Sequence, residues 1–266
     1  MYTLYMNYIF ISGIKLIFII YVYKMKKLLL FDVDGTIAES GQKIETDMRD
    51  LLQGLTDRYD IGIVGGGKMD KILEQMGDNN PFSHYFTECG CVYHSNGKLQ
   101  YVKNLREHPL YPQINQLVKT CLSFLSNVTY TLSGHFIDLR NGIIYVSLIG
   151  MVATQEERSY FMKLDQEFGY RQLLLQKLKK HSELLGLSDK ITICEGGRVG
   201  IAIYPNEYDK VQVLDVLVGY EEIHFFGDKY EEDGNDHHLI KDSRVIGHPV
   251  DSLEDTKNIL KSLSLS

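Results

Sequence analysis

The sequence predicts an α/β fold in which a parallel sheet with flanking helices is interrupted by a smaller α+β insert. In the first and last parts of the chain, short apolar runs alternate with segments of helical periodicity, a pattern typical of βαβ units. In the middle, two Gly-containing turns stand between apolar runs and beside two segments of helical periodicity, which favours hairpins packed with helices.

The first predicted strand covers residues 27–33, where an apolar run ends in a polar turn. Apolar residues at helical spacing predict a helix at 43–55. A second buried strand at 59–64 leads through the glycines at 65–67 into a second helix at 69–76. Strand, helix, strand and helix in this order predict a parallel sheet.

The insert begins after this unit. Asn141-Gly142 and Gly196-Gly197 are turn signals, and each predicts a hairpin. The hairpin strands are expected at 135–139, 143–147, 191–195 and 199–204, and helices at 156–168 and 172–185. The sheet resumes with strands at 222–226 and 244–247 and helices at 236–241 and 252–263. We therefore expect a discontinuous parallel-sheet core of residues 25–102 and 208–266, and an inserted domain at 103–207.

Residues 1–24 form an apolar extension that differs from the rest of the chain. The stretch 4–23 has the length of a membrane span, but it contains Asn7 and a costly Lys15, and it lacks the features of a signal peptide. Three interpretations stay open: a misassigned start with Met25 as the true initiator, which we favour, a membrane anchor, or a disordered tail. A membrane partner is expected only if the extension is a real anchor.

Charge and cysteine content exclude several classes of function. A net charge of −7 without clustered Lys and Arg argues against nucleic acid as a partner. The four cysteines lack C-x-x-C spacing, so neither a zinc site nor a disulfide framework is indicated. Cys89 and Cys91 are expected on one face of a strand, as reduced thiols of a cytoplasmic protein.

Asp32 and Asp34 follow the first predicted strand, at the edge where open α/β sheets bind ligands. A buried Asp at the end of an apolar strand is costly unless it is paired or ligates a metal, and Mg²⁺ prefers carboxylates combined with phosphate. We predict that Asp32 attacks phosphorus to form an aspartyl-phosphate and that Asp34 serves as acid and base. The hydroxyl of Thr36 can donate to a phosphate oxygen. The alternative is an Asx-turn with solvated acids.

A second loop is expected at the same edge of the sheet. Asp228 follows another apolar strand, and Asn235 and Asp236 stand just before a helix. Because parallel strands end at one edge, Asp228 is expected to complete the magnesium site. Lys210 could neutralise the aspartyl-phosphate and its leaving oxygen.

With these residues in this order, the chain resembles the haloacid dehalogenase superfamily and, more narrowly, the eukaryotic-type phosphomannomutases. The resemblance runs from residue 27 to the C-terminus, and its motifs are 32–36, 61–66 with 71–75, 140–142, 154–158, 209–210 and 225–229. It implies a Rossmann-like core with a cap, and Mg²⁺ held by Asp32, Asp228 and the Asp34 carbonyl. It also implies a hexose 1,6-bisphosphate activator, a homodimer formed through the cap, and a phosphosugar substrate. The activity implied is the interconversion of mannose 6-phosphate and mannose 1-phosphate in the cytoplasm, for GDP-mannose biosynthesis.

The resemblance also assigns residues that grip the substrate. Arg140 and Arg158 match arginines that hold its distal phosphate, and the amides of Gly66 and Gly67 match a phosphate-binding loop. A second cation site would fall at Asp242. Polar or charged residues of the family are replaced here at Gly41, Gly67, Met151, Gly200 and Ala202.

These replacements affect the binding of the substrate more than the transfer of the phosphoryl group. Groups that handle the transferring phosphoryl group are almost complete, whereas groups that hold the far end of a phosphosugar are depleted. Removing one charge-assisted hydrogen bond weakens binding by about 1.5–3 kcal/mol. A sugar-phosphate phosphatase and a catalytically weak binding or dimerisation relative therefore stay open as alternatives.

Two other motifs are weaker. Residues 62–69 nearly fit a P-loop, but Met69 stands where Ser or Thr must ligate Mg²⁺, which disfavours a nucleotide hydrolase. His237-His238 and the acidic run 231–233 are expected to form a solvated loop rather than a metal site.

Overall fold

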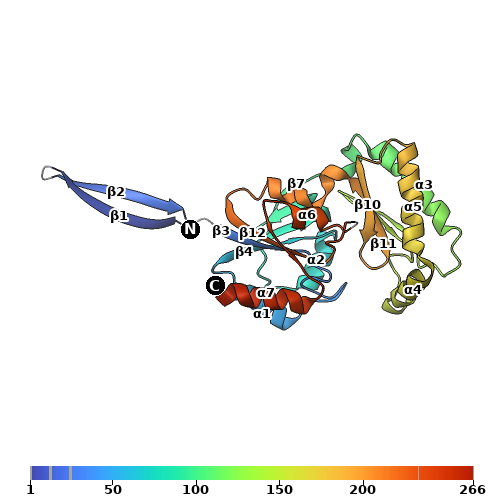
Figure 1. Ribbon diagram of the computed structural model, residues 1–266, viewed down its shortest axis with the longest axis horizontal. Helices are drawn as coiled ribbons and strands as arrows, with labels where there is room; N and C mark the ends of the chain where they lie inside the picture. Colours follow the sequence, from blue (N-terminus) through green and yellow to red (C-terminus); the bar gives the residue numbers. More distant parts are fainter. Residues whose placement is uncertain (1, 12–13, 24–25, 233, 266) are drawn as a thin grey trace.

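The computed structural model describes residues 2–11, 14–23, 26–232 and 234–265. Three parts follow one another along its longest axis: a two-stranded hairpin, a seven-stranded sheet with helices on both faces, and a four-stranded sheet with helices (Figure 1). We call the part built on the seven-stranded sheet the core and the part built on the four-stranded sheet the cap.

The core sheet has the strand order β13-β12-β3-β4-β5-β6-β7. The strands from β13 to β5 pair in parallel, whereas β5, β6 and β7 pair antiparallel. Their bounds are β3 (Lys26–Phe31), β4 (Tyr59–Val64), β5 (His84–Thr87), β6 (Val92–Ser95), β7 (Lys98–Val102), β12 (Tyr220–Gly227) and β13 (Ile246–Pro249).

Alternate residues of the central strand β3 enter apolar clusters on opposite faces of the sheet. Leu29 and Phe31 pack with the helices α1 (Thr46–Gln53), α2 (Met69–Met76) and α7 (Leu253–Leu265). Leu28 and Leu30 pack with the 3-10 helix η4 (Lys210–Asp215) and with α6 (His237–Lys241). This burial on both faces explains why the strand is a continuous apolar run rather than an alternating one. The predicted parallel sheet is confirmed.

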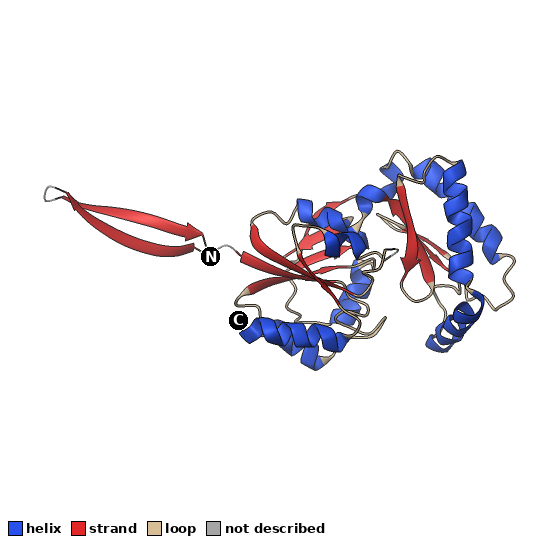
Figure 2. Ribbon diagram, in the orientation of Figure 1, coloured by secondary structure: helices blue, strands red, loops and turns tan. Residues whose placement is uncertain are grey.

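The cap sheet is antiparallel, with the order β10-β11-β9-β8. Its strands are β8 (Ile137–Leu139), β9 (Ile144–Ser147), β10 (Ile191–Gly196) and β11 (Gly200–Pro205). The cap helices are α3 (Tyr111–Leu125), α4 (Gln155–Phe168) and α5 (Tyr170–Leu184). In Figure 2, α3 and α5 lie on the side of this sheet that is turned away from the core. Both predicted hairpins are confirmed, while the boundaries at 102/103 and 207/208 stay predictions.

Three parts of the chain differ from the expectation. The helix α3 was not predicted, and neither were the strand β5 and the antiparallel edge of β6 and β7. Cys89 does not lie in a strand, because it belongs to the 3-10 turn η1 (Glu88–Gly90) and has φ of +58°. The Glu88 carboxylate holds this turn by accepting hydrogen bonds from the Asn141 side chain and the Gly142 amide, both at 3.0 Å. Two further 3-10 helices, η2 (Leu105–Glu107) and η3 (Asn206–Tyr208), lie where the chain passes between core and cap.

The apolar extension forms a hairpin. Strands β1 (Tyr2–Ile11) and β2 (Ile14–Tyr23) pair antiparallel in a sheet of their own, which points away from the core in Figure 1. Among the residues that the structure describes, no helix has both the length and the apolar character needed to cross a membrane. The three interpretations of this extension stay predictions.

Candidate active site

The chain leaves β3 in a tight turn that places Asp32 at the carboxyl end of the central strand. The Asp32 amide donates to the Phe226 carbonyl at 2.9 Å, so this turn starts beside the end of β12. Gly35 in the turn has φ of +86°, and an added Cβ would lie 2.6 Å from Oδ2 of Asp228. Glycine therefore permits both the turn and the close approach of the two loops.

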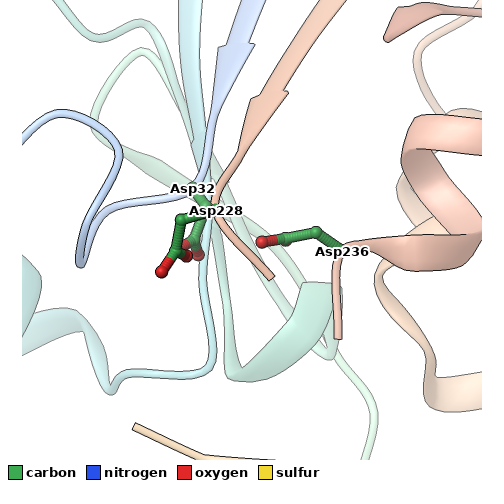
Figure 3. Close-up of side chains that lie close together, drawn as sticks. All are labelled: Asp32, Asp228 and Asp236. Atoms are coloured by element: carbon green, nitrogen blue, oxygen red, sulfur yellow. The ribbon is translucent and has the colours of Figure 1, made fainter. Parts of the chain in front are cut away.

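Three carboxylates meet at this edge of the sheet. Oxygens of Asp32, Asp228 and Asp236 all lie within 4.8 Å of one another, and Figure 3 shows Asp236 reaching toward the other two from the start of α6. The fully buried Lys210 bridges two of them, because its Nζ donates to Oδ1 of Asp32 and to Oδ1 of Asp236, both at 2.6 Å. The cluster thus holds one buried cation for three carboxylates.

This excess of negative charge shifts the titration of the cluster. Burial raises the pKa of Asp32 to about 8; Asp236 and Asp228 act in the same direction, and Lys210 opposes them. Burial also raises the pKa of Asp228. Burial alone would lower the pKa of Lys210, but Asp236 and Asp32 raise it above its ordinary value. A further cation among the three carboxylates would relieve this repulsion.

Three buried oxygens in the loops that carry Asp32 and Asp228 have no hydrogen-bond partner. Within the described ranges they are Oγ1 of Thr36, Oδ1 of Asp228 and Oδ1 of Asn235; Asp228 and Asn235 line the cavity between core and cap, whereas Thr36 is fully buried and does not line it. Buried polar atoms are nearly always satisfied, so unpaired oxygens beside the carboxylate cluster are available to a ligand. Carboxylate and other hard oxygens are the ligands that Mg²⁺ accepts. The residues present therefore fit a hard divalent cation together with a phosphate group.

Asp34 is not part of this group of three carboxylates, but it lines the same cavity between core and cap as Asp32 and Asp228 do. Its Oδ1 accepts from the Gly41 amide and from Nε2 of Gln75, both at 2.9 Å, and its Oδ2 lies 3.3 Å from Nζ of Lys71. Burial would raise the pKa of Asp34, but Lys71, the Gly41 amide and Gln75 outweigh burial and lower it. The side chain is thus held as a carboxylate that can accept a proton.

A cavity of about 580 Å³ lies between core and cap. At the core side it is lined by Asp32, Asp34, Asp228 and Asn235 and by the amide-bearing loop of Gly66 and Gly67. At the cap side it is lined by four arginines, Arg140, Arg158, Arg171 and Arg198. Opposite charges at the two sides suit a substrate that reacts at one end and is held by an anionic group at the other.

Arg140 connects the two sides. Its Nε donates to Oδ2 of Asp138 at 2.7 Å, and its Nη1 donates across the cavity to the Gly66 carbonyl at 2.7 Å. The guanidinium carbon lies 4.7 Å from the ring centroid of Tyr145. Asp138 also accepts from Nζ of Lys68 at 2.8 Å, so this group of side chains ties the cap to the core.

Arg158 is positioned by the start of α4. Thr154 caps this helix, because its side chain accepts from the Glu157 amide while the Glu157 side chain accepts from the Thr154 amide. Arg158 donates from Nε to the Ala153 carbonyl at 3.0 Å and from Nη2 to the Met151 carbonyl at 2.8 Å. The loop before the helix thus fixes the guanidinium at the cavity.

Tyr145 fills the space beside Gly200. An added Cβ at Gly200 would lie 2.4 Å from Cζ of Tyr145, and the Tyr145 hydroxyl donates to the Gly196 carbonyl at 3.0 Å. The ring therefore occupies the volume that a side chain at 200 would need. Ala202 and Met151 line the cavity as apolar groups, so this wall offers no polar side chain at 151, 200 or 202.

The structure brings most of the predicted site residues together, but it does not bring Asp242 to them. Both oxygens of Asp242 accept from Arg244, at 2.9 and 2.8 Å, which leaves this carboxylate engaged in an ion pair. Among the described residues, the candidate metal cluster contains Asp32, Asp228 and Asp236 without it. His237 and His238 also lie outside the cluster, and His238 contacts Asp209 instead.

Several residues of the site were not predicted from the sequence: Asp236, Tyr145, Lys71, Arg171 and Arg198. Asp236 could have been found, because it follows Asn235 at the start of a helix on the same sheet edge. Lys71 and Arg171 lie on helices, Tyr145 lies on β9 and Arg198 lies on a hairpin turn, so whether they reach the cavity depends on how the cap packs on the core.

Known proteins share this sequence pattern. A family model described as eukaryotic phosphomannomutase matches residues 48–265. The phosphomannomutase of Triticum aestivum is 34% identical over 242 residues, which cover 90% of this chain and 96% of the relative. Phosphomannomutase 1 of Homo sapiens is 35% identical over 240 residues, which cover 88% of this chain and 90% of the relative.

Among solved structures, the IMP-bound, N-terminally truncated IMP-nucleotidase of Plasmodium falciparum is similar in fold. The TM-score is 0.60 at 15% identity, over 91% of this chain and 68% of that one. This likeness concerns the fold alone. It confirms the predicted fold class, a parallel-sheet α/β core with an inserted α+β cap.

Proposed function

We propose, from the premise that this chain belongs to the eukaryotic phosphomannomutase family, that it interconverts mannose 6-phosphate and mannose 1-phosphate. The observation that carries the proposal is the position of Asp32. It lies in a buried cluster with Lys210 and two further carboxylates, and it faces four arginines across one cavity. The activity is that of an isomerase working by phosphoryl transfer.

In the proposed mechanism, a carboxylate oxygen of Asp32 attacks the phosphorus of a hexose 1,6-bisphosphate, and the P–O bond to the sugar breaks. Asp34 takes a proton from the sugar hydroxyl that accepts the phosphoryl group from phosphorylated Asp32, and it gives this proton to the departing sugar oxygen when Asp32 next attacks the bisphosphate. Its lowered pKa keeps Asp34 ionised at neutral pH, as the first of these roles requires. Lys210 neutralises charge that develops on the transferring group and on Asp32.

Mg²⁺ belongs to the same proposal. Asp32, Asp228 and the Asp34 carbonyl would hold it, with Asp236 as a further carboxylate of the cluster. When bound, it would polarise the phosphoryl oxygens as a Lewis acid. Thr36, the Gly66 and Gly67 amides and Asn235 would contact the transferring phosphate, while Arg140 and Arg158 would hold the distal one.

A homodimer formed through the cap and a cytoplasmic location complete the proposal. Large apolar side chains are exposed on the cap helices, among them Leu173 and Leu184 of α5. Light scattering coupled to size-exclusion chromatography tests the dimer. A monomeric mass at micromolar concentration would contradict it.

A phosphatase is the second candidate, because the wall formed by Met151, Tyr145 and Ala202 is apolar where a mutase needs a grip on the bisphosphate. The full-length protein is incubated with Mg²⁺, mannose 1-phosphate and a hexose 1,6-bisphosphate and followed by phosphorus NMR. Mannose 6-phosphate supports the mutase, free phosphate supports the phosphatase, and no change supports a binding protein. The Asp32→Asn variant is the control that abolishes either product.

A further inference from the structure

The four arginines at the cap side of the cavity fall into two pairs. Arg140 donates to Asp138, and Arg171 donates to Asp165 at 2.6 Å and forms an ion pair with Glu195 at 2.5 Å. Each of these two guanidiniums therefore already has a carboxylate partner. The other pair, Arg158 and Arg198, has no carboxylate partner among the described residues, and both side chains line the cavity.

Arg198 contacts the face of α4 that also carries Arg158. Arg198 donates from Nε to Sδ of Met162 at 3.0 Å. Met162 stands four residues after Arg158 on α4, so the two side chains are neighbours on one helix face, with Cβ atoms about 5–6 Å apart. A thioether is a weak acceptor, so the remaining donors of Arg198 are left for a better one.

The hairpin that carries Arg198 is anchored. Glu195 lies in β10, three residues before Arg198; it is held by Arg171, and Arg171 is held in turn by the buried Asp165. Gly197 has φ of +58°, which allows the turn to return the chain with Arg198 over α4. A fixed backbone lowers the entropic cost of placing the guanidinium for a ligand.

We propose that Arg198 is a phosphate-binding residue of this site and acts with Arg158 as a two-guanidinium clamp. Its ligand is the phosphate monoester at the end of a hexose phosphate that lies far from Asp32. This rests on the proposed function for the kind of substrate. It assigns to the hairpin turn the anion contact that Met151, which is apolar, and Gly200, which has no side chain, do not supply.

The test measures binding without turnover. Mannose 6-phosphate is titrated by calorimetry into full-length Asp32→Asn protein with Mg²⁺, with and without Arg198→Gln. Without this charge-assisted hydrogen bond, the Kd should rise by about tenfold or more. Arg198→Lys should recover part of this affinity, and Arg106→Gln, an exposed arginine outside the cavity, should leave the Kd unchanged.

Equal Kd values with and without Arg198→Gln, or no binding by either protein, would overturn the clamp. The proposed function is judged separately by phosphorus NMR on the unsubstituted protein. If the protein isomerises mannose phosphates and Arg198→Gln leaves KM unchanged, the proposed function is supported and the clamp is contradicted. If Arg198 contributes to binding but the protein does not isomerise mannose phosphates, the clamp is supported and the proposed function is contradicted.

Discussion

Lys210 and Asp32 form a buried ion pair, with 2.6 Å between Nζ and Oδ1, although they are 178 residues apart in the chain. The pair joins the end of the first core strand to the segment that returns from the cap. Because Nζ also contacts Asp236, one ammonium group holds two carboxylates that would otherwise repel each other. The active site therefore depends on the return of the chain from the insert.

Removing this ammonium group should destabilise the fold. Lys210→Met leaves Asp32 and Asp236 buried without their cation, which typically costs about 3–5 kcal/mol. Urea unfolding in EDTA measures the change. Lys26→Met is the matched control, because Lys26 pairs with Asp60 at the surface and should cost about 1 kcal/mol or less. Equal losses for the two variants would contradict the role of Lys210.

Mg²⁺ should stabilise the protein through Asp228. A ligand that binds only the folded state raises the melting temperature, so adding Mg²⁺ to EDTA-treated protein should raise Tm. Asp228→Asn should abolish most of this rise, which differential scanning fluorimetry detects. Asp242→Asn should retain it, because Arg244 already engages that carboxylate. A rise that is lost with Asp242→Asn instead would place the cation elsewhere.

Gly200 should not tolerate a side chain. Gly200→Ala would place Cβ 2.4 Å from the Tyr145 ring and 2.6 Å from the Val146 carbonyl, so the cap sheet must shift. We expect a loss of about 1–3 kcal/mol, seen as a lower Tm. Gly54→Ala is the control, since its nearest contact would be 3.5 Å away. A Gly200→Ala protein as stable as the parent would show that Tyr145 does not fill this space.

His248 should make stability depend on pH below neutrality. Burial lowers the pKa of His248 to about 4, helped by the adjacent His224, from an ordinary 6.5. The unfolded chain then binds a proton that the folded chain does not, so this contribution is fully present above pH 6.5 and is lost as the pH falls toward 4.

Replacing this histidine should therefore flatten the profile. Urea unfolding between pH 7 and pH 5 should show a loss of stability in the parent that is smaller in His248→Gln by about 1 kcal/mol or more. His94→Gln is the control, because His94 lies on β6, away from β12 and β13 in the strand order of the same sheet. Parallel profiles for parent and His248→Gln would contradict the assignment.

The site residues of the core could be predicted from the sequence better than those of the cap. Asp32, Asp228 and Lys210 could be placed together, because strands of a parallel sheet end at one edge and loops at that edge must meet. The position of Asp236 at the same sheet edge was predictable from the sequence, but its distance from Asp32 was not, because that distance depends on how tightly the loop folds back before α6. The fold class was predictable, because alternation of strands and helices leaves few architectures.

The cap residues were harder to predict. Arg198 lines the cavity because its hairpin packs on α4, and Tyr145 lines it because Gly200 has no side chain that would displace the ring. Cys89 was misplaced because long-range contacts of Glu88 with the cap impose a turn where local alternation suggests a strand. The local pattern of the sequence does not indicate such contacts between segments that are distant along the chain.

The most direct test is to identify the phosphorylated residue. The full-length protein is mixed with Mg²⁺ and a hexose 1,6-bisphosphate, quenched in acid within the first turnover, digested, and analysed by mass spectrometry. We predict a phosphoryl group on Asp32, present in the parent and absent in Asp32→Asn, together with mannose 6-phosphate formed from mannose 1-phosphate. Product formation with no phosphate on Asp32, or undiminished formation by Asp32→Asn, would contradict the proposed mechanism.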